Sequence, residues 1–454
     1  MLEFAGNDDG YLKELATFVE IASVSRDATS ETMQQAAEWL AAQISFAYGR
    51  VEQTAGHPVV RGEWLNAPGR PTILVYGHYD VQPTGDIEEW KTPPFSLVRD
   101  GDVIRGRGVT DDKGPVLIVL KVAQAFMKQE GKLPLNVKFL FEGEEEIGSP
   151  NLGEYVRSHA DELAADLVIS ADGAMWRPTE PSLSIASKGL VTFDVEVSGA
   201  KEDLHSGRYG GTVSNPVHAL AEVLANLHNP DGSIAVAGFY DGIPTMSSQR
   251  RAEIAAVGFD DDEYIKSLGV AALFGEVGYS TIERLWERPT LEINGIKAGG
   301  KYTVIPHVAT AHISCRLVPG QNPEKVMESI NEHFSKIRLA GVKIDVRMDK
   351  EGVPAYTIPA DHPAIRAATA ALEVVYPGQE VLLAVIGGTL PATALFEKVL
   401  GAKTLFFSFA TADEKHHAPN EFMRIKRLRE GMKAWEVLWR LLAEGTHQIK
   451  MEGK

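Results

Sequence analysis

Four short apolar runs, each closed by charged or turn-forming residues, constrain the fold of this chain more than any other feature. They are PTILVYG from 71, LNVKFLFEG from 135, ADLVIS from 165 and KTLFFSFA from 403. Their length and apolar content predict buried strands. Segment 115–132 between the first two has Pro115 near its start and Gly131 at its end, which predicts a helix. Strand, helix and strand in this order predict an α/β fold with a mostly parallel central sheet flanked by helices.

The middle of the chain follows a different pattern. Segments 189–200 and 307–320 alternate apolar and polar side chains, which predicts a sheet with one solvated face. A chain of 454 residues is about three times the usual domain length, so two domains are expected. We therefore predict an inserted α+β domain over 188–356 and an outer domain formed by 1–187 and 357–454. Helices are expected from apolar spacing at 11–22, 31–48, 215–229, 323–338, 362–377 and 424–445.

Charge and cysteine content restrict the partners and the compartment. The chain has 45 lysines and arginines against 62 aspartates and glutamates, a formal net charge of −17. Such a charge disfavours nucleic acids and anionic membranes as partners. The single cysteine, Cys315, cannot form an intramolecular disulfide, which favours a reducing compartment. The acidic first residues do not resemble a secretory leader, and no stretch of about 18 apolar residues occurs. We expect a cytoplasmic protein.

Acids and histidines follow the apolar runs, at the points where the predicted strands end. The carboxyl ends of parallel strands meet at one edge of a sheet, so these side chains are expected to converge there. At about 4 Å, two carboxylates repel each other by about 1 kcal/mol in water and about 4 near a protein surface, so convergence requires protonation or a cation. The motif GRGVTDDKGP is predicted to place Asp111 and Asp112 between a glycine turn and the start of a helix, and it is counted as a fifth strand end. The side chains concerned are His78 and Asp80, Asp111 and Asp112, Glu142 and Glu144 to Glu146, Asp172, and His416 and His417.

The mixture of imidazoles and carboxylates without thiolates predicts a metal centre, with zinc preferred and manganese or cobalt possible. Three carboxylates and two neutral imidazoles around two divalent ions leave one positive charge, which a bridging hydroxide would cancel. Such a hydroxide is a nucleophile at neutral pH, and an unligated glutamate beside it can accept its proton and deliver it to a leaving amine. The residues therefore predict hydrolysis of an amide bond.

A nucleotide-binding loop is the main alternative for GRGVTDDKGP. The loop lacks the Gly-Lys-Ser/Thr ending of a phosphate loop, and its two carboxylates would repel a phosphate. Taken one at a time, the strand-end acids and histidines are equally compatible with turn-forming or solvated surface residues. Their occurrence together favours the metal centre.

Seven motifs lie in order along nearly the whole chain: GHYDVQP, GRGVTDDKGP, FEGEEEIGS, SADG, DLHSGRYGG, KYTVIP and SCRLVPGQNP. Together they resemble the co-catalytic zinc peptidases of the carnosinase and cytosolic nonspecific dipeptidase group. The resemblance implies a catalytic domain over 1–187 and 357–454, and a lid over 188–356 that also forms a homodimer. It implies two divalent ions per chain and hydrolysis of dipeptides that have a free C-terminal carboxylate.

The resemblance also implies roles at the metal centre. Five side chains would hold the ions: His78 and Asp172 one, Glu146 and His417 the other, with Asp111 bridging both. Asp80 would orient His78, and Glu145 would be the general base and acid. His417 is preferred to His416 because it matches the family's histidine that precedes Asn-Glu, here HAPNE.

Substrate contacts follow from the resemblance as well. His205 would reach the partner subunit's site and steady the tetrahedral oxyanion. Thr303 and Arg316 from the lid, with Thr389 from the catalytic domain, would meet the substrate carboxylate, to which a guanidinium can donate two hydrogen bonds. Animal dipeptidases of the group often have Asp-Asn where this chain has Asp111 and Asp112, and serine where it has Thr389, which leaves the dipeptide preference open.

Two further functions remain possible. A deacylase or desuccinylase of N-acyl amino acids would use the same metal centre. The long insertion between Asn229 and Thr290, with GFYDGIPTMSSQ, resembles the dipeptidases and favours a dipeptidase. A non-catalytic binding protein on the same scaffold would be expected to lack ligands or the base, and all of them are present in this sequence.

Overall fold

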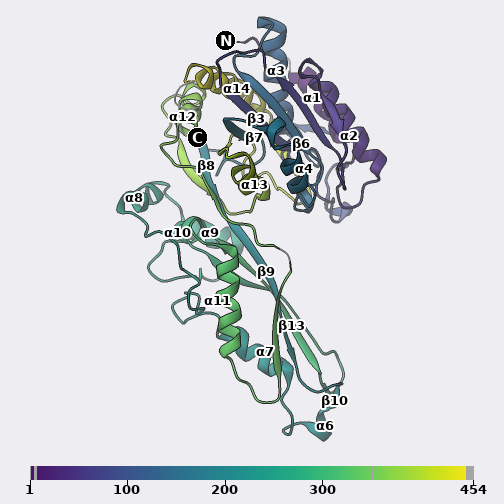
Figure 1. The fold of residues 1–454 in the computed structure, drawn as a ribbon, viewed down its shortest axis with the longest axis vertical. Coiled ribbons are helices and arrows are strands. Elements are labelled where there is room, and N and C mark those ends of the chain that lie inside the picture. Colours follow the sequence, from purple (N-terminus) through teal and green to yellow (C-terminus); the bar gives the residue numbers. More distant parts are fainter. Residues whose placement is uncertain (1, 5–7, 350, 446–454) are drawn as a thin grey trace. The chain divides into compact units, whose positions relative to one another are not determined.

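The chain divides into two compact units in the computed structural model, which describes residues 2–4, 8–349 and 351–445 (Figure 1). The first unit contains the described parts of Met1–Ile185, Ile358–Ile386 and Pro391–Lys454, and the second contains Ala186–Thr357 and Gly387–Leu390. The insertion predicted over 188–356 did not include the last of these segments. Gly387–Leu390 joins the second unit because its Gly388 carbonyl accepts the Lys188 N–H, at 3.0 Å.

A six-stranded sheet with the order β1-β2-β6-β3-β7-β17 forms the centre of the first unit. The last four strands are parallel, while β1 and β2 pair antiparallel, which confirms the predicted α/β class and mostly parallel sheet. The strands are β1 (Arg50–Glu52), β2 (Val59–Trp64), β3 (Thr72–His78), β6 (Asn136–Glu142), β7 (Leu167–Ser170) and β17 (Thr404–Phe406).

Helices lie on both faces of this sheet (Figure 1). Leu74 and Tyr76 of β3 pack with Leu140 against α4, α5 and α13, forming one hydrophobic core. Gly77 faces the opposite side, where α3 passes so close that an added Cβ would lie 2.6 Å from Val116 Cγ2. The helices of the unit are α1 (Asp8–Glu20), α2 (Ser30–Gln43), α3 (Lys113–Glu130), α4 (Leu152–Ser158), α5 (Ala160–Leu163), α12 (Pro363–Val375), α13 (Pro391–Leu400) and α14 (Ile425–Glu444).

The helix predicted to start after Asp111 and Asp112 is confirmed, but counting this motif as a fifth strand end is wrong. Asp111 and Asp112 follow no strand of the central sheet, because they lie in the loop that leads directly into α3. The nearest preceding strand, β5 (Val103–Arg105), belongs to a separate sheet with β4 (Val98–Asp100) and β18 (Phe422–Arg424). Another three-stranded sheet consists of β15 (Tyr356–Thr357), β8 (Ser182–Ser187) and β16 (Leu382–Ile386).

The second unit is built on a four-stranded antiparallel sheet with the order β11-β13-β9-β14. Val191, Phe193, Val195 and Val197 of β9 are buried against α7 and α11, while Asp194 between them is exposed. This is the predicted sheet with one solvated face. Its elements are β9 (Gly189–Ser198), β10 (Leu204–His205), α6 (Ser206–Tyr209), α7 (Pro216–Ala225), α8 (Ser248–Ala256), α9 (Asp261–Leu268), α10 (Thr281–Glu287), β11 (Thr290–Ala298), β12 (Val304–Ile305), β13 (Val308–Leu317), α11 (Pro323–Lys336) and β14 (Lys343–Met348).

No helix of the described residues is both long and apolar enough to cross a membrane.

Candidate metal centre and active site

The site lies where the order of the parallel strands reverses. The chain passes from β3 through α3 to β6 on one side, and then crosses over to β7 on the other side of β3. In open α/β sheets such a switch point is where ligands bind, beyond the carboxyl ends of the strands. His78 ends β3, Glu145 and Glu146 follow β6, and Asp172 follows β7.

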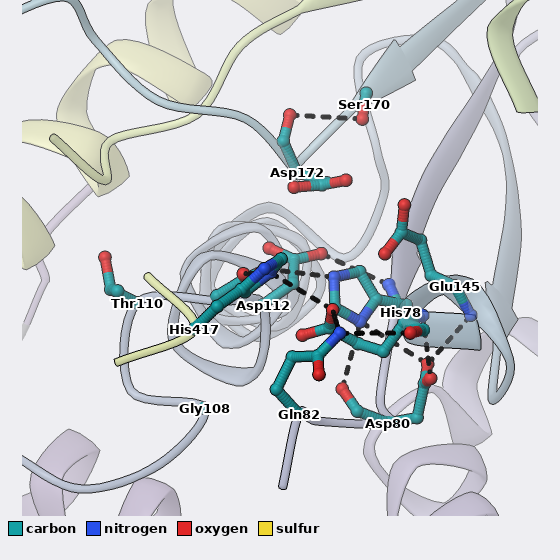
Figure 2. A network of polar contacts seen from close by, with 12 residues as sticks. His78, Asp80, Gln82, Gly108, Thr110, Asp112, Glu145, Ser170, Asp172 and His417 are labelled. Atoms are coloured by element: carbon teal, nitrogen blue, oxygen red, sulfur yellow. Dashed lines mark hydrogen bonds and ion pairs between the residues drawn. The ribbon is translucent and has the colours of Figure 1, made fainter. Parts of the chain in front are cut away.

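Two groups of side chains with the composition of metal sites meet at Asp111. One contains His78, Asp111 and Asp172, the other Asp111, Glu146 and His417, and within each group one ligand atom per residue lies within 4.8 Å of the others. Asp111 places Oδ1 at 3.1 Å from His78 Nε2 and Oδ2 at 3.0 Å from His417 Nε2. Glu146 Oε2 lies 3.1 Å from the same His417 nitrogen. Figure 2 shows His78, His417 and Asp172 facing a common space.

Asp80 contacts both the His78 ring and the turn after β6. The nearest partner of His78 Nδ1 is the backbone carbonyl of Asp80, at 3.0 Å, while its carboxylate Oδ1 lies at 3.4 Å. The carboxylate accepts the backbone N–H groups of Glu145 and Glu146 at 3.2 and 3.0 Å. One residue therefore fixes the His78 ring through its backbone and the turn after β6 through its side chain.

Glu145 differs from its neighbours in the freedom of its side chain. No hydrogen bond or ion pair holds the Glu145 carboxylate among the residues that the structure describes, whereas Glu146 Oε2 accepts Gln82 Nε2 at 2.9 Å. In Figure 2 the Glu145 carboxylate lies on the side of Asp172, and only its backbone nitrogen is joined to Asp80. A carboxylate without fixed partners can accept and return a proton.

The concentration of acids perturbs the titration of the whole group. Burial raises the pKa of Asp172 to about 6, and it raises the pKa of Glu145 well above its usual range, with Asp172 and Glu146 adding to the effect. Hydrogen bonds to Asp111 and Glu146 raise the pKa of His417 to about 10. Burial alone would lower the pKa of His78, yet Asp111 and Asp80 raise it well above the usual value. The centre therefore attracts positive charge.

The substrate-binding residues inferred from the sequence form two pairs within the second unit. His205 and Thr303 lie at the β10–β12 ladder, where the Thr303 carbonyl accepts the Ser206 N–H at 3.0 Å, and both side chains are exposed. Arg316 Nη1 donates to Thr389 Oγ1 at 2.8 Å. Burial lowers the pKa of Arg316, and no carboxylate pairs with it among the described residues. A half-buried guanidinium of this kind is suited to an incoming carboxylate.

Comparison with known proteins identifies the family. The profile of Peptidase family M20/M25/M40 matches residues 74–441, which include every residue of the two metal-binding groups. The chain belongs to this family. The fold class and the resemblance to the carnosinase and dipeptidase group, both predicted from the sequence, are thereby confirmed. This M20 peptidase is a hydrolase acting on peptide bonds.

Relatives of this M20 peptidase extend over most of its length. It is 31% identical to the Beta-Ala-His dipeptidase of Rattus norvegicus over 374 residues, 80% of this chain and 75% of that one. It is 28% identical to the Cys-Gly metallodipeptidase dug1 of Schizosaccharomyces pombe, over 94% of each. The structure of an M20 family metallo-carboxypeptidase from Sulfolobus solfataricus superposes with a TM-score of 0.84 at 31% identity, covering 96% of this chain and 100% of that one.

The side chains of this M20 peptidase fit divalent ions, whose use its family membership implies. Zinc ligands at about 2.1 Å in tetrahedral geometry are separated by about 3.4 Å. Contacts of 3.0 and 3.1 Å between Asp111 and the two imidazoles are compatible with this spacing. The donor set of imidazole nitrogens and carboxylate oxygens suits zinc, and also manganese or cobalt.

Several supporting residues were not found from the sequence. Gln82 binds Glu146, while Glu414 and Glu421 bind the loop before α3. For Glu421 the only signal was its place in HAPNE, where the histidine alone was interpreted.

Replacing Gly77 by alanine is expected to disturb the metal centre. The added Cβ would lie 2.6 Å from Asp112 Oδ2, which accepts the His78 N–H at 3.2 Å. Overpacking of this kind costs about 1–3 kcal/mol, so we expect a lower free energy of unfolding and reduced metal content, measured by denaturant titration and elemental analysis. Gly10→Ala is the control, because nothing lies within 4 Å of its added Cβ. Equal metal content in both variants would contradict the expectation.

Proposed function

We propose that this M20 peptidase is a metal-dependent dipeptidase that hydrolyses the amide bond of dipeptides with a free C-terminal carboxylate. The observation that carries the proposal is the junction of two metal-binding groups at Asp111, with the free carboxylate of Glu145 beside them. The names of the relatives, Beta-Ala-His dipeptidase and Cys-Gly metallodipeptidase, support dipeptides as substrates.

The proposed ligands are His78 and Asp172 for one ion, Glu146 and His417 for the other, and Asp111 for both. Two divalent ions, most suitably zinc, would polarise the scissile carbonyl and lower the pKa of a bound water, so that this water can lose a proton and attack at neutral pH. Glu145 would accept the proton of this water and donate it to the nitrogen of the leaving amine.

The second unit is proposed to recognise the substrate. Arg316 and Thr389 would bind the C-terminal carboxylate together with Thr303, and the Arg316–Thr389 hydrogen bond presets the guanidinium for that contact. His205 would act at the partner subunit's site and stabilise the oxyanion. We accordingly propose that the first unit is the catalytic domain, that the second is a lid and dimerisation domain, and that the protein is a cytoplasmic homodimer.

A carboxypeptidase acting on longer peptides is a second candidate. It is favoured by the similarity to the Sulfolobus solfataricus metallo-carboxypeptidase. Both activities need the free C-terminal carboxylate, and they differ in whether a longer chain N-terminal to the scissile bond is accepted.

The test is hydrolysis of a matched panel after chelation and after refilling with zinc or manganese. Chelation should abolish cleavage of Ala-Ala-type dipeptides, and refilling should restore it together with two ions per chain. Faster cleavage of tripeptides and N-blocked peptides would support the carboxypeptidase, and release of acyl groups without dipeptide cleavage would support the deacylase. A chain that binds no divalent ion would refute the proposal.

Metal binding should release protons and strengthen as the pH rises. With a pKa of about 10, the His417 imidazole is protonated at neutral pH before an ion binds, whereas a metal ligand must be neutral. Raising the pH toward 10 removes this competition, so affinity increases with pH. Calorimetry in buffers of different ionisation enthalpy measures the number of protons released. An affinity that is the same at about pH 6 and about pH 8 would contradict this ligand assignment.

A further inference from the structure

The loop before α3 is tied to the segment that carries His417 by two buried glutamates, Glu414 and Glu421. We propose that Glu421 is a positioning residue for Asp111, and that with Glu414 it fixes the Asp111 backbone against the His417 turn. The inference rests on the proposed function in that it takes Asp111 and His417 as metal ligands.

Glu421 is surrounded by donors from one short stretch of chain. Its Oε1 accepts the backbone N–H groups of Gly108, Thr110 and Asp111 at 3.0, 3.0 and 3.2 Å. Its Oε2 accepts Arg107 Nη1 at 2.8 Å and also the Gly108 N–H at 3.0 Å. The Glu421 side chain is fully buried and Arg107 is 1% exposed. A carboxylate with this many donors fixes the backbone that ends in Asp111.

Glu414 makes the second connection from the other side of His417. Its Oε2 accepts the Thr110 hydroxyl at 2.6 Å and the Thr411 N–H at 3.0 Å, and its Oε1 accepts the Arg424 N–H at 3.1 Å. The hydroxyl and the two backbone donors come from segments about 300 residues apart along the chain. Glu414 therefore joins the loop of Asp111 to the two ends of the His417 segment.

The turn between the two glutamates needs such support. Lys415, His417 and Asn420 all have positive φ angles, 60°, 58° and 66°, in the left-handed region that non-glycine residues seldom adopt. Asn420 is held by the Lys91 N–H at 2.7 Å and by the Glu89 carbonyl at 2.8 Å. The backbone of His417 is thus set by its anchored neighbours, and Figure 2 shows its ring lying across from Gly108 and Thr110.

The hydrogen bonds of Glu414 and Glu421 are expected to affect the two metal positions unequally. The position formed by Asp111, Glu146 and His417 takes two of its three side chains from the connected loops. The position formed by His78, Asp111 and Asp172 takes two from the ends of parallel strands. Weakening Glu421 should therefore reduce metal affinity mainly at the position that contains His417.

The test is a stepwise zinc titration of chelated protein against a chromophoric competitor, with Glu421→Gln beside the wild type. An amide cannot accept from all of these donors, and it leaves the Arg107 charge unpaired. We expect one binding step to weaken by about 10–100-fold and the other to change much less. The absorption spectrum of the cobalt-loaded variant should change as well. Glu436→Gln is the matched control, because Glu436 is also buried and accepts the Leu2 N–H and Arg440 Nε.

The control separates positioning from general stability. Both variants should lower the melting temperature of the metal-free chain, and only Glu421→Gln should alter zinc affinity. If Glu421→Gln does not fold, Thr110→Val removes only the hydroxyl bond to Glu414 and should weaken the same step by about fivefold. Wild-type affinities in the folded variant would overturn the inference and leave the proposed dipeptidase standing. A wild type that binds two ions but cleaves no peptide would reject the function alone.

Discussion

Glu145→Gln is expected to lower the kcat for a dipeptide by about 10²–10⁴-fold while two metal ions remain bound. Glutamine has nearly the same shape, so the backbone N–H of residue 145 can still donate to Asp80. The amide cannot accept the proton of the attacking water or return it to the leaving amine. The measurement is kcat and KM with a saturating metal concentration, together with elemental analysis of the same sample.

The control for this variant is Glu154→Gln on α4, whose side chain is 81% exposed. It should leave kcat and metal content unchanged. A Glu145→Gln enzyme with near-normal kcat would show that another group handles the proton. A variant that lost its metal would show instead that Glu145 is a ligand.

Asp111→Asn is expected to remove metal from both positions and to reduce activity by about 10³-fold or more, because loss of an ion forfeits several kcal/mol of transition-state stabilisation. Asp111 is the residue that the group His78, Asp111 and Asp172 shares with the group Asp111, Glu146 and His417. The Asp111 carboxylate places one oxygen beside His78 and the other beside His417, so that each can serve one metal position. An asparagine amide has a single, uncharged oxygen to offer. Metal content per chain and zinc affinity measure the effect.

The adjacent Asp112 provides a matched control. Burial raises the pKa of Asp112 well above its usual range, and its Oδ2 accepts the His78 N–H at 3.2 Å. An asparagine can accept that hydrogen bond, so Asp112→Asn should keep both ions and most of the activity. Equal losses in the two variants would reject the bridging role of Asp111.

The sequence could predict much of the candidate site because local patterns indicate where the proposed ligands lie. Apolar runs indicate buried strands, and parallel strands bring their ends to one edge. The convergence of His78, Glu146 and Asp172 could therefore be expected from the sequence alone. The choice of His417 over His416 came from a motif, and it is His417 that lies 3.0 Å from Asp111.

Other features had no local signal. The sequence predicted that Asp111 precedes a helix, but counting it among the strand ends was wrong, because a loop leading into a helix can reach the same edge without a strand. The sequence predicted the contact of Asp80 with His78, but not its contacts with the backbone N–H groups of Glu145 and Glu146. A carboxylate that accepts backbone N–H groups cannot be distinguished in sequence from one that orients a ring. Any N–H can be the donor, so the partner's identity is not encoded.

The sequence by itself determined the α/β class, and it placed His78, Glu146 and Asp172 of the proposed metal centre at the ends of strands, because apolar periodicity and residue chemistry are local properties. Only the tertiary structure decided what holds that centre together. The bonds from Glu421 to Gly108, Thr110 and Asp111 join segments more than 300 residues apart. Such bonds depend on the distance between backbones in the folded chain, a quantity that spacing along the sequence does not contain.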